Sequence, residues 1–307
     1  MGNSQSSDGT PSTMYLSTDA EFVAQAAATA LTLSPTSSVS GKTFDRFVQV
    51  FLENQDFDIA AGDPSLAELS ARGIVLDNYW AITHPSQPNY VAAVGGSTHG
   101  VLLDSFYRID EDTSTIVDLL DDAGISWGLY QEDMPFSGFE ADWVNQENGA
   151  NDYVRKHNPL MSYDSATNDV NRLAQNKNFT LFYSDLESNS LPQWMFITPN
   201  MTNDGHDTSV TVAGNWFETF ITPLLSDENF NSDSGKGTLV VLTFDECENY
   251  FGENKVFTLL LGSAIPEEKK GTTDSTKYNH YSLLKTVEEN WGLGSLGEGD
   301  DDVDAFF

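Results

Sequence analysis

Two pairs of oxygen-bearing side chains follow the two most apolar runs of the chain. Glu53 and Asn54 directly follow the run RFVQVFL, and Asp245 and Glu246 directly follow the run TLVVLTF. If both runs are parallel strands of one sheet, their carboxyl ends meet at the same edge. Carboxylates and amide carbonyls are hard ligands, and a divalent cation would relieve the repulsion between the acids. Acids at strand ends also serve as helix caps, but the two pairs together favour a cation site.

A serine that could act as a nucleophile lies between these pairs. His84-Pro-Ser86-Gln-Pro-Asn-Tyr90 runs into an apolar stretch, which predicts a helix that begins just after Ser86. The unpaired amides of that first turn favour an anion. A serine hydroxyl needs activation by a base or a metal, and a cation held by the acidic pairs would supply it. A serine before a helix is most often only a cap, so this interpretation depends on the acidic pairs.

Basic side chains are scarce, and three of them lie together. Asp and Glu number 47 against 14 Lys and Arg, which gives a formal net charge of −33 at pH 7. Such a surplus argues against nucleic acid as a partner and repels phosphate esters, so a site for them needs local positive charge. Arg155, Lys156 and His157 are consecutive and could bind phosphate oxygens.

The other four histidines differ in context. His206 lies in a polar loop directly after the run that ends at Thr198, which places it at the predicted site edge. His280 precedes a predicted helix and either caps it or approaches the site. His84 and His99 flank the Ser86 segment. Each of these side chains could equally be structural or exposed.

Apolar runs alternate with amphipathic stretches along the chain, which predicts an α/β fold with a mainly parallel central sheet and helices on both faces. The predicted strands are Arg46 to Leu52, Ile74 to Ile82, Ile125 to Tyr130, Phe179 to Tyr183, Gln193 to Thr198, Thr238 to Phe244 and Val256 to Leu261. The predicted helices are Ser65 to Arg72, Ser114 to Ala123, Val210 to Leu225 and Tyr281 to Trp291.

The domain organisation is predicted to be simple. Residues 1–41 are rich in Ser, Thr and Ala and indicate a flexible leader, and residues 42–307 form one catalytic domain that ends in a solvated acidic tail from Glu298 to Asp304. The single Cys247 excludes an intrachain disulfide. No stretch approaches the roughly 20 apolar residues of a membrane span, so no integral membrane contact is expected.

Targeting signals are weak. No basic residue precedes Lys42, so a signal peptide is not visible. The first six residues match an N-myristoylation pattern, for which chance or a cloning scar is the better account. Sequons at Asn178 and Asn200 predict glycosylation only if the protein is secreted.

Taken together, these motifs resemble the phosphoesterase family of phospholipases C and acid phosphatases, from about Lys42 to about Leu296. The runs ANDYVRKHNP and LPQWMFITPNMTNDGHD look particularly like secreted fungal acid phosphatases. The shared motifs are Glu53-Asn54, Ser86 before Gln-Pro-Asn-Tyr90, Lys156-His157-Asn-Pro159, Pro199-Asn200 leading to Gly205-His206-Asp207, Phe244-Asp245-Glu246, and Tyr278-Asn-His-Tyr281 with Val287-Glu-Glu-Asn-Trp-Gly292.

The resemblance implies an alkaline-phosphatase-like fold and a set of roles. It implies that Ser86 is the nucleophile and a metal ligand, and that His157 and His206 contact the phosphoryl group. The implied metal ligands beside Ser86 are Glu53, Asn54, Asp245 and Glu246. One divalent ion is expected, with Ca, Mg, Mn and Zn all open.

Further features of the sequence bear on the metal ligands and on the distinction from sulfatases. Related enzymes often carry two aspartates where this chain has Asp245 and Glu246, which leaves the geometry of the second ligand open. His206, Asp207 and His280 are candidates for a second metal. The Ser86 segment lacks the arginine of a sulfatase motif.

The expected activity is that of a metal-dependent acid phosphatase that acts on small phosphate monoesters through a phosphoserine, with His206 as the general acid. Arg155, Lys156, His84 and His280 are the predicted substrate-binding residues. One alternative is a phospholipase C or other phosphodiesterase that uses the same site, and another is a catalytically silent acidic binding protein. The resemblance favours a secreted, cell-wall or periplasmic-type location.

Overall fold

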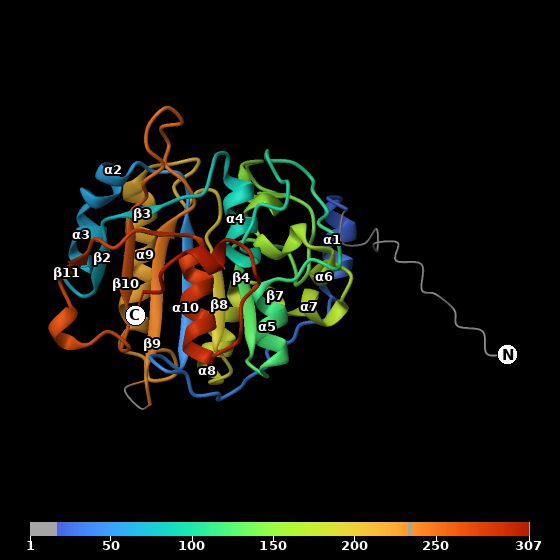
Figure 1. The fold of residues 1–307 in the computed structure, drawn as a ribbon. Coiled ribbons are helices and arrows are strands. Elements are labelled where there is room, and N and C mark those ends of the chain that lie inside the picture. The colour runs from blue at the N-terminus through green and yellow to red at the C-terminus, as the bar shows by residue number, and fades with distance from the viewer. Residues whose placement is uncertain (1–16, 233–234, 307) are drawn as a thin grey trace.

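A twisted eight-stranded sheet forms the centre of the molecule, with strand order β11-β2-β10-β9-β1-β8-β4-β7 (Figure 1). The computed structural model describes residues 17–232 and 235–306, so the N-myristoylation pattern lies outside the described residues. The strands of this sheet are β1 (Arg46–Leu52), β2 (Ile74–Leu76), β4 (Trp127–Gln131), β7 (Asn176–Asn178), β8 (Trp194–Thr198), β9 (Thr238–Phe244), β10 (Thr258–Leu261) and β11 (Thr272–Asp274).

The middle of the sheet is parallel and fully buried. β1 pairs with β9 over its whole length and with β8 over Phe47 to Val50, in parallel register. β10 is antiparallel to both of its neighbours, β9 and β2. Continuous apolar runs such as TLVVLTF suit strands that are covered on both faces, and every residue of β9 is buried. The predicted mainly parallel α/β fold is confirmed.

Helices cover both faces of the sheet. α10 and α5 lie in front of it in Figure 1 and α9 lies behind it; α4 packs against α10 and α5, and α2 and α3 pack against α9. The helices are α1 (Ala20–Ala27), α2 (Phe57–Ala61), α3 (Pro64–Ser70), α4 (Ser86–Gly95), α5 (Ile116–Asp122), α6 (Asp164–Thr167), α7 (Val170–Gln175), α8 (Thr180–Glu187), α9 (Val210–Leu224) and α10 (Tyr281–Trp291). Two small sheets pair β12 (Tyr278–Asn279) with β3 (Tyr79–Trp80) and β5 (Trp143–Val144) with β6 (Asn151–Tyr153). None of these helices is long and apolar enough to cross a membrane within residues 17–232 and 235–306.

The predicted strand from Phe179 to Tyr183 is wrong. This run begins α8, because Phe179 and Phe182 are buried three positions apart while Thr180 and Tyr183 are exposed. The side chain of Asn178 accepts a hydrogen bond from the Thr180 amide at 2.7 Å and starts the helix. The strand at this edge is instead β7, whose polar sequence Asn-Lys-Asn gives no apolar signal.

The two ends of the described chain contact the domain. In α1, which lies in the predicted flexible leader, Val23 and Ala26 are buried in a cluster with Phe136 and Phe139. The predicted solvated tail is exposed in part, but Asp300 is fully buried. Its carboxylate accepts hydrogen bonds from the Ser295 hydroxyl and from two backbone amides, so this part of the prediction is wrong. Buried hydrogen bonds, which composition does not reveal, hold Asp300 inside.

Candidate active site

The acidic pairs and Ser86 meet at the carboxyl ends of β1 and β9. Glu53 directly follows β1, Asp245 directly follows β9, and Ser86 is the first residue of α4. Ser86 Oγ lies 3.1 Å from Glu53 Oε2 and 3.3 Å from Glu246 Oε1, within hydrogen-bonding distance of both. All four side chains are buried. The serine hydroxyl therefore lies between two carboxylates from different strands.

The loop before Ser86 is fixed by a residue of the helix that follows it. Asn89 Oδ1 accepts hydrogen bonds from the amides of Ile82 and Thr83, and Asn89 Nδ2 donates to the carbonyls of Thr83 and Pro85. Asn89 is fully buried in α4. These four bonds hold the serine at the start of the helix, where the first-turn amides lack intrahelical partners.

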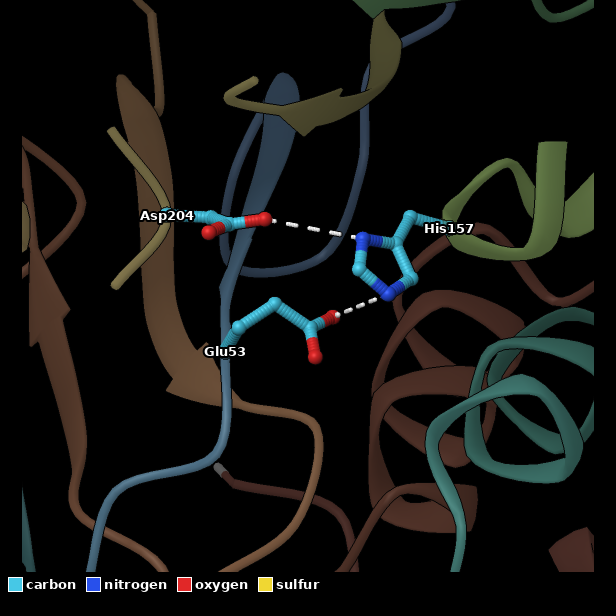
Figure 2. A group of neighbouring side chains, drawn as sticks. All are labelled: Glu53, His157 and Asp204. Atoms are coloured by element: carbon cyan, nitrogen blue, oxygen red, sulfur yellow. Dashed lines mark ion pairs between the residues drawn. The ribbon is translucent and has the colours of Figure 1, made fainter. Parts of the chain in front are cut away.

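Glu53 also faces a second group of donors, on its Oε1 side. Tyr90 donates a hydrogen bond to Oε1, and His157 Nε2 lies 3.3 Å from the same atom. His157 Nδ1 lies 3.5 Å from Asp204 Oδ2, so its ring sits between two carboxylates, as Figure 2 shows. The three side chains Glu53, His157 and Asp204 offer ligand atoms within 4.8 Å of one another. They could hold a metal ion.

Sequence reasoning did not include Asp204, Tyr90 or Asn89 in the site. Asp204 lies in the same loop as His206 and only two residues before it. The signal that could have found it is the polar loop after β8, where the sequence analysis selected the histidine alone. Tyr90 and Asn89 lie in the helix that Ser86 begins, one turn away from it, and face the same interior.

Burial dominates the electrostatics of these acids. Burial, followed by the charge of Asp245, raises the pKa of Glu53 well above its usual range. Burial and the charge of Glu246 raise the pKa of Asp245 in the same way, and burial and the charge of Glu53 raise that of Glu246 to about 8. Burial and the charge of Glu53 also raise the pKa of Asp204 well above its usual range. Several buried carboxylates this close together need protons or a cation.

Unpartnered atoms in the site fit a cation. Within the described residues, Asp245 Oδ2, Asp204 Oδ2 and His157 Nε2 are buried and have no hydrogen-bond partner. Such atoms are rare in folded proteins unless they serve a ligand. Asn54 is half-buried beside them, and its backbone amide donates to Asp245 Oδ1 at 3.1 Å. The donor set of carboxylates, a hydroxyl and an imidazole suits a divalent ion.

His157 and His206 lie on the same side of the site but differ in exposure. Burial, followed by the charge of Lys156, lowers the pKa of His157 well below its usual value, which favours the neutral ring. The rings of His157 and His206 are 5.9 Å apart. His206 is partly exposed, and its Nδ1 lies 2.7 Å from Asp207 Oδ1. The exposed ring can exchange protons with solvent, whereas the buried ring cannot do so directly.

Of the basic cluster, Lys156 approaches the acids and Arg155 does not. Burial alone would lower the pKa of Lys156, but the charge of Glu53 and a hydrogen bond to Asp104 raise it overall. Arg155 is buried, and its Nη2 donates to the backbone carbonyls of Met161 and Tyr107. Arg155 thus holds two loops together, whereas the charge of Lys156 acts on Glu53 and Asp204.

The two remaining predicted substrate-binding histidines contact the acidic pair. His84 Nδ1 contacts Glu246 Oε2, and its ring stacks on Tyr250 with centroids 4.2 Å apart. His280 is fully buried, and its Nε2 lies 2.7 Å from the backbone carbonyl of Asp245. Burial lowers the pKa of His280 to about 4, so it is neutral. His280 is placed behind the Asp245 backbone, where it positions that loop.

Two relatives of this chain are named acid phosphatases. The chain is 55% identical over 292 residues to "Phosphate-repressible acid phosphatase" of Penicillium chrysogenum, which covers 95% of this chain and 69% of that protein. It is 52% identical to "Acid phosphatase" of Aspergillus fumigatus, over 91% of this chain and 62% of that protein. The chain therefore spans about two thirds of the length of these relatives.

Solved structures and a family comparison agree with the fold. A Vibrio parahaemolyticus protein of the alkaline phosphatase superfamily superposes with a TM-score of 0.51 at 13% identity, covering 91% of this chain and 77% of that one. The model of the Phosphoesterase family matches residues 63–294. The match includes Ser86, His157, His206 and the acidic pair after β9, so the site described above lies largely within it. This chain belongs to the Phosphoesterase family.

Proposed function

We propose that this chain is an acid phosphatase that hydrolyses phosphate monoesters with Ser86 as the nucleophile. The observation that carries the proposal is the position of Ser86 Oγ, buried at the start of α4 between Glu53 and Glu246. The relatives named as acid phosphatases support it. The positive end of the α4 dipole also favours an anion near Ser86, although the Gln87 amide of this first turn already donates to Asp104.

The proposed metal ligands are the residues that surround Ser86. Glu53, Asp245, Glu246 and Ser86 itself would hold one divalent cation, with Asn54 beside them. When bound, the cation would lower the pKa of the serine hydroxyl and balance negative charge on phosphoryl oxygens. The Glu53, His157 and Asp204 group shares Glu53 with this set and is a second place where an ion could bind.

The proposed reaction has two displacement steps at phosphorus, and residues of this chain carry out the proton transfers. Ser86 Oγ attacks phosphorus while its proton passes to one of the two carboxylates beside it, and the bond from phosphorus to the alcohol oxygen breaks. His206, partly exposed and on the same edge, donates a proton to the departing alkoxide. In the second displacement water attacks the phosphoserine and gives one proton to His206, which restores the proton that His206 lost in the first step. The bond from phosphorus to Ser86 Oγ breaks, and the proton held by the carboxylate returns to Ser86 Oγ.

Positive charge for the phosphoryl oxygens comes from few groups. Lys156 interacts electrostatically with Glu53 and Asp245, and its Nζ lies 2.8 Å from Asp104 Oδ2. His157 is neutral, and its unpartnered Nε2 can donate or accept one hydrogen bond. The net charge of −33 at pH 7 repels phosphate esters, and this repulsion weakens as the carboxylates protonate at low pH. The weaker repulsion at low pH favours phosphate binding at acid pH.

An extracellular location is a further part of the proposal and rests on the resemblance to secreted fungal enzymes. Glycosylation at the two sequons has less support. The Nδ2 atom of Asn178 donates to the backbone carbonyl of Met134, and that of Asn200 donates to Asp133 at 2.6 Å. A glycan on either amide would replace one of its two hydrogens and would have to fit beside these bonds.

The test compares three substrates with and without a chelator. We expect turnover of p-nitrophenyl phosphate, little turnover of its diester or of phosphatidylcholine, and loss of activity on chelation that added metal restores. A preference for the diester or the lipid would support a phosphodiesterase or phospholipase C instead. Absence of turnover with all three, in metal-loaded protein, would contradict an enzymatic role and favour a binding protein.

A further inference from the structure

A cavity of about 580 Å³ lies beside the candidate site. Three chain segments line it, around residues 104–106, 140–142 and 154–156, together with Thr18. Its volume falls in the range of small-molecule pockets in proteins. The proposed chemistry at Ser86 does not itself use this cavity.

Asp104 and Lys156 form a wall that the cavity shares with the Ser86 site. Asp104 Oδ1 accepts a hydrogen bond from the amide of Gln87, the residue after Ser86, at 3.0 Å. Asp104 Oδ2 accepts a hydrogen bond from Lys156 Nζ at 2.8 Å. The charge of Glu53 in the Ser86 site also acts on Lys156. One ion pair therefore separates the cavity from the start of the helix that carries Ser86.

The lining includes an exposed aromatic surface. Phe106 is 56% exposed, and the guanidinium carbon of Arg155 lies 4.1 Å from its ring centroid. An exposed ring with one face already covered leaves further aromatic surface for a ligand.

We propose that this cavity binds the alcohol part of the phosphate ester and selects aromatic alcohols through Phe106. This inference rests on the proposed function and adds the substrate class. An aromatic alcohol would place its ring against Phe106 while its phosphate reaches Ser86. A small alkyl alcohol would leave this ring unused.

The test compares 2-phenylethyl phosphate with ethyl phosphate, because both release alkyl alcohols and differ mainly in the ring. In the wild-type protein we expect a higher kcat/KM for the phenylethyl ester. Phe106→Ala should lower that preference about tenfold, the size expected when an aromatic contact and its buried area are lost. Its kcat/KM for ethyl phosphate should stay within about twofold of wild type.

Three further variants separate the ring from other effects. Phe106→Tyr should keep the preference because it keeps the ring. Leu103→Ala changes an exposed side chain of the same loop outside the cavity lining and should leave the preference unchanged. Phe251→Ala removes a wholly exposed ring on the loop after β9 and should also leave it unchanged. Melting temperatures would show that all four variants fold.

The failure of this inference differs from the failure of the proposed function. If both esters are hydrolysed in a Ser86-dependent way but Phe106→Ala keeps the preference, or if Phe251→Ala removes it, the cavity is not the alcohol site and the phosphatase stands. If neither ester is hydrolysed by metal-loaded protein while phosphate diesters are, both proposals are wrong.

Discussion

Glu53 Oε2 lies 3.1 Å from Ser86 Oγ, although the two residues belong to different elements and are 33 positions apart in the chain. The other oxygen of the same carboxylate faces Tyr90 and His157. Glu53 therefore joins the serine to the second donor group. A single carboxylate that serves both groups is the feature on which the proposed metal site depends.

Replacing Glu53 with Gln should lower both metal affinity and activity. The substitution keeps the shape but deletes one of the buried negative charges, so we expect metal affinity to fall by about 10- to 100-fold or more. The metal-free variant should melt at a higher temperature than metal-free wild type, because less repulsion remains among the buried acids. Calorimetric metal titration and thermal unfolding measure the two effects.

A matched control for this variant is Glu268→Gln, which changes an exposed glutamate outside the site. It should change neither metal affinity nor the melting temperature beyond experimental error. Wild-type metal affinity in the Glu53 variant would show that Glu53 is not a ligand.

His206→Asn tests the general acid. If His206 protonates the departing alkoxide, the variant should lose about 10²- to 10⁴-fold in rate with alkyl phosphates. The loss should be much smaller with p-nitrophenyl phosphate, whose alcohol leaves without a proton. Equal losses with both substrates would mean that His206 binds the phosphoryl group or supports a metal. A lower melting temperature alongside the lost activity would point to a structural role in its loop.

A carboxyl pair far from the proposed chemistry predicts how stability depends on pH. Glu288 in α10 is buried against Asp300, and burial together with the charge of Asp300 raises the pKa of Glu288 to about 8. An unfolded glutamate releases its proton near pH 4.5. Between these values the folded state holds the proton and the unfolded state does not, so this group makes stability fall as the pH rises from 4.5 to 8.

Glu288→Gln should remove this loss, because an amide does not ionise. We expect the variant to gain stability relative to wild type at pH 8 and to gain little at pH 4, as measured by thermal unfolding at both values. The neighbouring Glu289→Gln changes an exposed carboxylate and serves as the control. A Glu288→Gln gain that is the same at both pH values would contradict the raised pKa.

The buried ion pair of Lys177 and Asp185 fixes the edge of the sheet to α8. Lys177 is fully buried, and its Nζ lies 2.6 Å from Asp185 Oδ2 and 3.0 Å from the Tyr130 hydroxyl. Lys177→Met would leave Asp185 without its cation and should cost about 3–5 kcal/mol of unfolding free energy in urea titration. Lys270→Met, in an exposed pair with Glu267, should cost about 1 kcal/mol or less. Similar costs for both variants would show that burial does not set the strength of the Lys177 pair.

The parts of the fold that follow from the sequence are those with continuous apolar runs. β1 and β9 are buried on both faces, so their runs identify them and the acids that follow them. β7 is polar because Lys177 is paired inside the protein, and a buried pair between residues eight positions apart leaves no periodic signal. The run after it resembles a strand because its aromatic residues are dense, although Phe179 and Phe182 lie on the buried side of a helix and Tyr183 is exposed.

The site was predictable as a set of strand-end acids with a serine between them. Asp204 and the role of Arg155 were not. Asp204 becomes part of the site because the loop after β8 turns it toward His157, which depends on tertiary structure. Arg155 lies in a sequence typical of phosphate binding, but its guanidinium is used by the carbonyls of two neighbouring loops. Residue type gives the possible chemistry of a side chain, and packing decides which partner it meets.

The most direct test of the account is to identify the residue that carries phosphate during turnover. The metal-loaded protein would be quenched in acid while it hydrolyses a monoester, digested, and analysed by mass spectrometry, beside a Ser86→Ala variant. The account predicts phosphate on the peptide that contains Ser86, no phosphopeptide in the variant, and activity of the variant below about a tenth of wild type. Phosphate on another residue, or a Ser86→Ala variant that keeps its activity, would contradict it.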